Sequence, residues 1–295
     1  MQQLNDFERK GWIKFEFDQH LEHWAKTANS EINLKLRNKE FLQNGLTCQG
    51  TWFVGVEALE NDPDGSLNGV PLRGPFKSLM ESYKTRTLHL AQVSIIFQGY
   101  PKPRGQESQS SFNFRLKRDA AHVDGLIAET PGGPRRLKEP HAYVLGIPIN
   151  QAPENASPMV VWEGSHHLMS SAFKRFFSNQ NLNEWENLDI REIYFETRKE
   201  VFRKCKRVVL HANVGESYMI HRHCLHGISP WDPKNVSFSE GRKIVYFRPE
   251  LEKLAREAAK KLGLELVIKK TAYGDLEPEI ISLNINKDPK LSNLS

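Results

Sequence analysis

From residue 87 to residue 249 the sequence is dominated by short β-type segments that turns separate from one another. The segments are rich in β-branched and aromatic residues and are bounded by Gly, Pro, Asn or Asp, as strands usually are. Strands are predicted at 88–98, around residue 122, and at 141–150, 159–163, 207–213, 216–222 and 242–248. Many short strands at this spacing, with helices mainly at the chain ends, are typical of a jelly-roll β-sandwich. We therefore expect a mainly β fold with flanking helices.

No linker divides the 295 residues, and a single domain is expected over 1–295. With 39% hydrophobic and 26% charged residues, the composition is that of a globular protein with a substantial core. Asp18 precedes Leu21, Trp24 and Ala28 at helical spacing, which predicts an N-capped helix. The expected parts are a helical N-terminal part at 1–86, a jelly-roll core at 87–249 with a helical insert at 168–204, and a C-terminal helix and tail at 250–295.

Composition and charge narrow the location and the partners. The N-terminus has no apolar signal-peptide core and no apolar run is long enough to span a bilayer, so secretion and membrane insertion are disfavoured. The three cysteines form no Cys-x-x-Cys pair, which favours reduced thiols in a cytosol. The net charge of +5 comes from separate basic clusters and not from the dense basic stripe of a nucleic-acid binder. We expect a cytoplasmic protein that binds neither membranes nor nucleic acids.

His122 and Asp124 stand two residues apart in the sequence AHVDG, which reads as a strand. Side chains at such positions leave the same face of a strand. An imidazole and a carboxylate that face one cavity are two of the three ligands in the facial triad of non-haem Fe(II) sites. A chain with 11 histidines can show this pattern by chance, so its significance depends on a third ligand elsewhere.

The third ligand is expected from the sequence HRHCLHGISP at 221–230. Arg242 follows His226 by 16 positions and opens the next predicted strand. An open metal site needs another neutral ligand, and a co-substrate with a free carboxylate needs a buried arginine that binds it through two hydrogen bonds. Both residue types are present, in the order His-x-Asp, His, Arg.

Together these segments resemble the phytanoyl-CoA dioxygenase family of Fe(II)- and 2-oxoglutarate-dependent oxygenases. The resemblance runs from about residue 88 to residue 249 and includes AHVDG, LHG at 225–227 and GRKIV at 241–245. It also includes PENASPMVVWEGSH at 153–166, which is similar to the family's E-N-G … P-G-S-H signature. Ala156 replaces the glycine of that signature and Glu163 replaces its proline.

The resemblance implies a double-stranded β-helix, a cupin-like jelly-roll barrel with iron in its mouth. His122, Asp124 and His226 would then be the iron ligands, and Arg242 would bind the distal carboxylate of 2-oxoglutarate. Gln92 matches a glutamine that related hydroxylases place near the co-substrate. The implied reaction uses O₂, hydroxylates an unactivated C–H bond of a small metabolite and releases succinate and CO₂.

The chain departs from the family at one further position. The family commonly has Ser after His-Gly, whereas this chain has Ile228 and then Ser229.

The sequence leaves two alternative functions open. A cupin-like metal-binding protein that does not use 2-oxoglutarate would explain the strands and histidines without Arg242. A zinc hydrolase with a His₂Asp site is the other alternative.

The substrate is expected to contact the segments most specific to this chain, at 99–118, 131–140 and 168–204. Their arginines favour an anionic or carboxylate-bearing metabolite.

Overall fold

The computed structural model describes residues 2–83, 87–130, 132–139, 141–178, 180, 182–232, 234, 238–249, 265–270 and 276–282. In the last two ranges it describes the backbone of an antiparallel pair, β13 (Glu265–Lys270) and β14 (Leu276–Ser282). The C-terminal helix predicted for about 249–262 falls almost entirely outside the described residues.

A large antiparallel sheet of seven strands forms the base of the fold. Its order is β1-β10-β7-β12-β4-β3-β2. The strands are β1 (Trp12–Phe15), β2 (Leu46–Thr47), β3 (Trp52–Leu59), β4 (Ala91–Ile96), β7 (Tyr143–Pro148), β10 (Ser217–His221) and β12 (Arg242–Phe247). The sheet therefore takes β1 to β3 from the N-terminal part, which also carries four helices.

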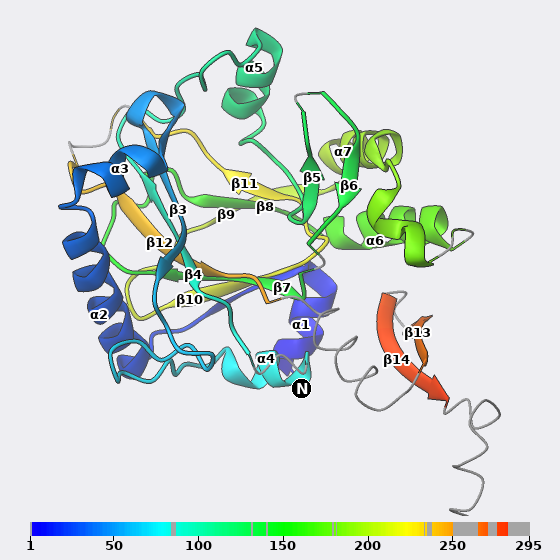
Figure 1. The fold of residues 1–295 in the computed structure, drawn as a ribbon, viewed down its shortest axis with the longest axis horizontal. Helices are drawn as coiled ribbons and strands as arrows, with labels where there is room; N and C mark the ends of the chain where they lie inside the picture. Colours follow the sequence, from blue (N-terminus) through cyan, green and yellow to red (C-terminus); the bar gives the residue numbers. More distant parts are fainter. Residues whose placement is uncertain are drawn as a thin grey trace, which may run out of the picture.

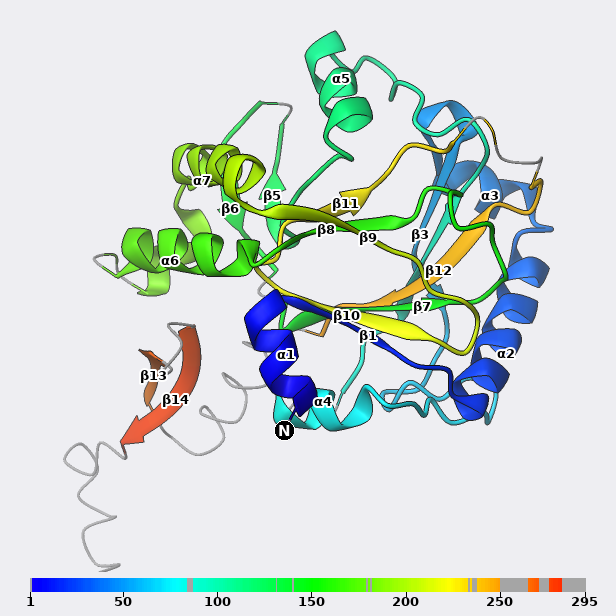
Figure 2. The same cartoon turned by 180° about the vertical axis from the view of Figure 1, so that it is seen from behind.

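A smaller antiparallel sheet faces the large one, as Figures 1 and 2 show. It has the order β11-β8-β9, with β8 (Met159–Glu163), β9 (Lys206–Leu210) and β11 (His226–Ile228). A single bridge between His122 and His226 adds the segment before β5 to its edge. Apolar side chains from both sheets fill the space between them, including Val144, Met159, Val161, Ile220, Ile244 and Tyr246.

The helices cover the outer faces of the sheets. The N-terminal part contains α1 (Gln2–Lys10), α2 (Gln19–Lys35), α3 (Lys39–Gly45), a 3₁₀ turn (Cys48–Gly50) and α4 (Lys77–Ser82). The insert contains α6 (Ser165–Phe177), a 3₁₀ helix (Leu182–Asn187) and α7 (Arg191–Lys204), which pack on the small sheet. β5 (Leu126–Ala128) and β6 (Arg135–Leu137) form a separate hairpin beside α7.

α2 begins where the sequence predicts. The carboxylate of Asp18 accepts hydrogen bonds from the backbone N–H groups of His20 and Leu21, at 2.8 and 3.0 Å. Leu21, Trp24 and Ala28 are fully buried against the outer face of the large sheet. The expected combination of antiparallel sheets with helices is confirmed at this level.

The segment at 99–118, expected as a polar loop, contains a helix, α5 (Gln109–Lys117). The Ser108 side chain caps its first turn by accepting from the backbone N–H of Ser111. Arg115 lies inside the protein and forms an ion pair with Glu107, and both side chains are almost fully buried. The sequence does not predict this helix, because its residues are mainly polar and its buried residue is the charged Arg115.

Candidate metal centre

Two histidines far apart in the sequence lie side by side at the edge of the small sheet. His122 donates its backbone N–H to the carbonyl of His226 at 2.8 Å, and the reverse bond is 3.0 Å long. This pairing places the two ring centroids 4.7 Å apart. The strand predicted around residue 122 is reduced to this single bridge, and Asp124 lies two residues on, in the turn before β5, with its carboxylate directed to both histidines. Each of the three residues offers one ligand atom within 4.8 Å of the other two.

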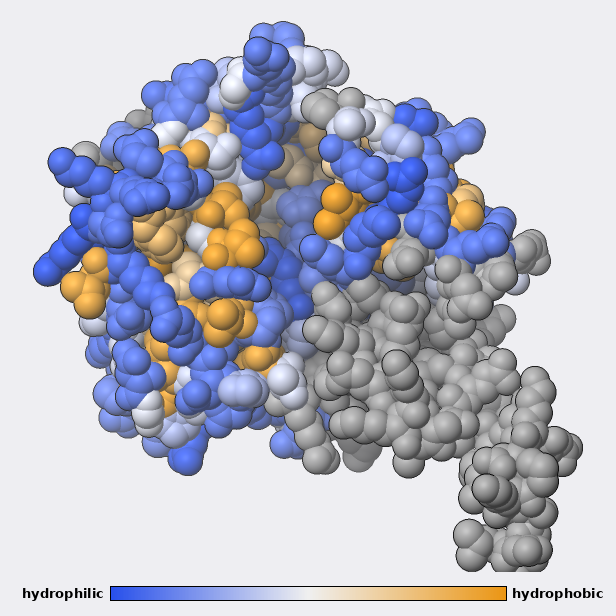
Figure 3. Space-filling view, in the orientation of Figure 1, coloured by the Kyte–Doolittle hydropathy of each residue, from blue (hydrophilic) through white to orange (hydrophobic). Residues whose placement is uncertain are grey.

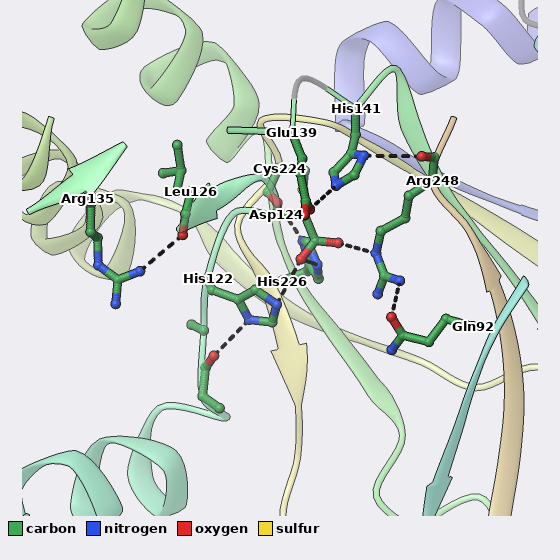
Figure 4. A network of polar contacts seen from close by, with 12 residues as sticks. Gln92, His122, Asp124, Leu126, Arg135, Glu139, His141, Cys224, His226 and Arg248 are labelled. Atoms are coloured by element: carbon green, nitrogen blue, oxygen red, sulfur yellow. Dashed lines mark hydrogen bonds and ion pairs between the residues drawn. The ribbon is translucent and has the colours of Figure 1, made fainter. Parts of the chain in front are cut away.

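Hydrogen bonds to the backbone fix the tautomer of each histidine. Nδ1 of His122 lies 2.9 Å from the Ala120 carbonyl, and Nδ1 of His226 lies 2.9 Å from the Cys224 carbonyl (Figure 4). A carbonyl oxygen can only accept, so each Nδ1 carries a proton and Nε2 is the ring nitrogen that remains for a metal. Oδ1 of Asp124 faces these Nε2 atoms at 3.0 Å from His122 and 3.6 Å from His226.

The donor set fits a divalent transition metal. Two imidazole nitrogens and a carboxylate oxygen that converge on one point form a ligand set that such a metal binds. Within the part of the chain that the structure describes, no other group of His, Cys, Asp or Glu side chains has this geometry. The site is also accessible, because nearly half of the His122 side chain is exposed.

Arg248, just beyond β12, holds the second oxygen of Asp124. Its Nε donates to Oδ2 at 2.5 Å and its Nη1 donates to Oε1 of Gln92 at 2.9 Å (Figure 4). Burial alone would raise the pKa of Asp124, but the charges of Arg248 and the contacts with His226 and His122 hold it well below its usual value. The carboxylate is therefore ionised at neutral pH.

Three further contacts fix Arg248 in place. Its backbone N–H donates to Nε2 of His89 at 2.8 Å, and its carbonyl lies 3.1 Å from Nδ1 of His141. Its guanidinium also stacks on Tyr246, 5.0 Å from the ring centroid. Burial, the largest influence, lowers the pKa of His141, which favours its neutral form. Neither His89 nor His141 was predicted as a site residue, because neither stands in a recognisable sequence motif.

Arg242 lies at the opposite end of β12 from Arg248, pairing with Ile96 of β4. The two arginines are six positions apart along the chain, or about 20 Å along the sheet. Only 5% of Arg242 is exposed, and its Nε and Nη2 have no hydrogen-bond partner among the described residues. A small cavity beside it is lined by residues of both sheets, including Tyr218 and Leu210.

The structure thus brings His122, Asp124 and His226 together, and it places Gln92 against Arg248. Arg242 shares the inner face of its strand with Ile244, Tyr246 and Arg248, since these positions alternate. The even spacing from Arg242 to Arg248 is the sequence signal that points both arginines inward.

Ile228 and Ser229 follow His226 and Gly227 at the end of β11. Ile228, two positions on, shares the face of His226 and is buried among apolar residues. The Ser229 hydroxyl donates to the Pro230 carbonyl at 3.5 Å. His223 lies away from the triad, where its Nδ1 is 2.7 Å from the Ser170 hydroxyl of α6.

A hydrophilic hollow marks the surface where α5, β11 and the β5–β6 hairpin come together (Figure 3).

Within the described residues, no helix combines the length and apolar character needed to cross a bilayer.

No family model and no curated protein matches the sequence. Comparison with solved structures finds the non-haem α-ketoglutarate-dependent carbocyclase SnoK from nogalamycin biosynthesis, with 10% identity, 84% of this chain and 83% of that chain covered, and a TM-score of 0.40. EctD from S. alaskensis has 12% identity, coverage of 83% and 75%, and a TM-score of 0.41. AviO1 from Streptomyces viridochromogenes Tue57 has 13% identity, coverage of 84% and 94%, and a TM-score of 0.40. Similarity of this degree does not establish a shared activity.

Proposed function

We propose that this protein is an Fe(II)- and 2-oxoglutarate-dependent oxygenase, similar to the phytanoyl-CoA dioxygenase family, that hydroxylates a C–H bond of a small molecule. The observation that carries the proposal is the convergence of two imidazole Nε2 atoms and one carboxylate oxygen within 4.8 Å. Three protein ligands of this type leave coordination positions open, which a co-substrate and O₂ require.

The path of the chain supports a double-stranded β-helix. Strands β4, β7, β10 and β12 belong to the large sheet, whereas β8, β9, β11 and the His122 segment belong to the small one. The chain crosses repeatedly from one sheet to the other between β4 and β12. Such winding produces a jelly roll with its interior between the sheets.

Arg242 supports 2-oxoglutarate as the co-substrate. A buried guanidinium without a partner is costly, and a carboxylate satisfies it through two parallel hydrogen bonds. It lies between the sheets, on the same inner face as Tyr246 and Arg248, and we propose that it binds the distal carboxylate of 2-oxoglutarate there.

His122, His226 and Oδ1 of Asp124 would hold the iron. Iron bound there, with 2-oxoglutarate and O₂, would supply the oxidant for hydroxylation as succinate and CO₂ are released. The Ala120 and Cys224 carbonyls bind Nδ1 of each ring, which leaves Nε2 as the nitrogen for the metal. Arg248 restrains Asp124, so that only one carboxylate oxygen is directed to the metal.

Two alternatives make different predictions. A cupin-like metal-binding protein leaves Arg242 without a role, and a zinc hydrolase needs no dicarboxylate. We therefore propose anaerobic addition of Fe(II) and then 2-oxoglutarate to the full chain, monitored by visible absorption. A weak charge-transfer band is expected for the wild type and should be absent from His226→Ala. Iron binding without this band would contradict the use of 2-oxoglutarate, and the absence of iron binding would contradict the metal centre.

A further inference from the structure

A second site lies outside the two sheets, between α5, α7 and the tip of the β5–β6 hairpin. A cavity of about 660 Å³ opens there, within the size range of small-molecule pockets. In Figure 1 the hairpin rises between the two helices, and Figure 2 shows the same arrangement from behind. The cavity lies on the far side of the His122 strand from the metal centre, because Ala121 and Val123 point toward the helices of the insert.

Four cationic side chains line this cavity, and two of them lack an acidic partner. Arg191 pairs with Asp189 at 3.3 Å, and Lys199 pairs with Glu196 at 2.7 Å. Arg118 and Arg198 form no ion pair with any of the described residues. The cavity therefore has an excess of positive charge that the described residues do not neutralise.

Aromatic rings hold these two arginines in place. The guanidinium of Arg198 lies 4.3 Å from the ring centroid of Phe114 and 4.8 Å from that of Phe195. The guanidinium of Arg118 lies 4.8 Å from the ring centroid of Phe202. Stacking uses the faces of a guanidinium and leaves its in-plane N–H groups for a carboxylate or a phosphate.

Arg198 makes one backbone contact, a hydrogen bond of 3.4 Å from Nη1 to the Ala121 carbonyl. Burial lowers its pKa, which shows that the charge is poorly solvated where it lies. Its side chain also interacts with Tyr194. An oxyanion would supply the negative charge that these neutral partners lack.

We propose that the cavity between α5 and α7 binds an oxyanion, a carboxylate or a phosphate, carried on a planar aromatic group. Arg118 and Arg198 bind the anion, while Phe114, Phe195 and Phe202 contact the ring. The site is distinct from the metal centre and does not depend on the proposed oxygenase activity. The contact of Arg198 with Ala121 connects an occupant to the residue next to His122.

Calorimetric titration of the full chain with phenyl phosphate tests the proposal, with phenol and inorganic phosphate as comparisons. Phenyl phosphate should bind more tightly than either, because only it offers both the charge and the ring. Arg118→Gln and Arg198→Gln should each weaken binding about tenfold or more, the effect of losing one charge-assisted hydrogen bond. Arg203→Gln, an exposed position of the same helix outside the cavity, should bind as the wild type does.

Three results would overturn the proposal. The first is binding by Arg118→Gln that is as tight as that of the wild type. The second is loss of phenyl phosphate binding in a folded His226→Ala variant, which would place the ligand at the metal centre. The third is no binding by the wild type at millimolar phenyl phosphate. Retained binding in His226→Ala supports a separate site even if the oxygenase proposal fails.

Discussion

Arg248 donates through Nε to Oδ2 of Asp124 at 2.5 Å, while Oδ1 of the same carboxylate faces both histidines. The two oxygens therefore have different roles. One is bound by a guanidinium that Gln92, Tyr246 and the backbone contacts keep in place. The other faces the histidines and would be the oxygen that binds a metal.

The first prediction concerns Arg248→Met. Without the guanidinium, Asp124 can rotate or bind through both oxygens, and loss of such an outer partner commonly weakens metal binding about 10–100-fold. Titration with Mn(II) or Fe(II) under anaerobic conditions measures the change. Arg203→Met, at an exposed position, is the control and should bind as the wild type does.

The same variant should acquire a pH dependence. In the wild type, Arg248 helps hold the pKa of Asp124 well below 3.8, so the carboxylate stays ionised through the mildly acidic range. Burial is the largest influence on that pKa and raises it, and loss of Arg248 removes the charge that opposes burial most. Metal affinity of Arg248→Met should therefore fall as the pH falls, at pH values where the wild type is unaffected. Parallel titration curves for the two proteins would contradict this role.

The second prediction separates two neighbouring histidines. His226→Ala removes an Nε2 ligand atom and should abolish stable Fe(II) binding. His223→Ala should retain it, because that ring contacts Ser170 and lies edge-on to Phe173, away from Asp124. Metal content after gel filtration distinguishes the variants. Equal iron retention in both would exclude His226 as a ligand.

Local spacing made part of this site predictable. The two-residue separation of His122 and Asp124 requires a shared face in any extended segment. Asp18 likewise predicts the start of α2 because a cap acts over two or three residues. Interactions of this kind depend on the nearest neighbours along the chain, so the sequence alone specifies them.

Contacts between residues on different strands could not be predicted from local spacing. Gln92, Asp124 and Arg248 meet only because β4 and β12 lie opposite the small sheet, and no local pattern encodes that distance. The resemblance to the dioxygenases predicts Arg242 as the carboxylate ligand, and no local pattern predicts that Arg248 binds Asp124. The structure shows two inward-pointing arginines with different surroundings. Arg248 is paired with Asp124, whereas Nε and Nη2 of Arg242 have no hydrogen-bond partner among the described residues.

The third prediction concerns the buried thiol of Cys224. Burial raises the pKa of Cys224 to about 12, so the thiol should stay protonated and unreactive in the folded protein. Unfolded cysteine ionises near 9.0, so this group's contribution to stability is complete below pH 9.0 and decreases as the pH rises toward 12.

Reaction with a disulfide reagent near pH 8 should therefore label Cys205, which is only partly buried, before either Cys224 or Cys48. A denaturant should expose all three. Rapid labelling of Cys224 in the native protein, identified by peptide mass, would show that this part of the small sheet opens readily. Cys205→Ser provides the control, since it should remove the early phase alone.

The fourth prediction concerns Arg242→Met, in which an apolar side chain of similar length replaces a buried guanidinium. Nε and Nη2 of Arg242 have no partner among the described residues, so the charge is costly in the free protein. The substitution should raise the melting temperature of the protein without ligand, because replacing a poorly satisfied buried charge by an apolar group is often stabilising by about 1–4 kcal/mol. It should at the same time remove the further stabilisation that 2-oxoglutarate gives to the wild type in the presence of Mn(II).

Arg242→Lys keeps a charge but loses the paired hydrogen bonds, and should weaken the binding of 2-oxoglutarate by about 1–3 kcal/mol. Thermal unfolding of the three proteins, each with and without 2-oxoglutarate, tests both effects. A lower melting temperature for Arg242→Met together with normal 2-oxoglutarate binding would mean that Arg242 supports the fold and that another residue binds the carboxylate.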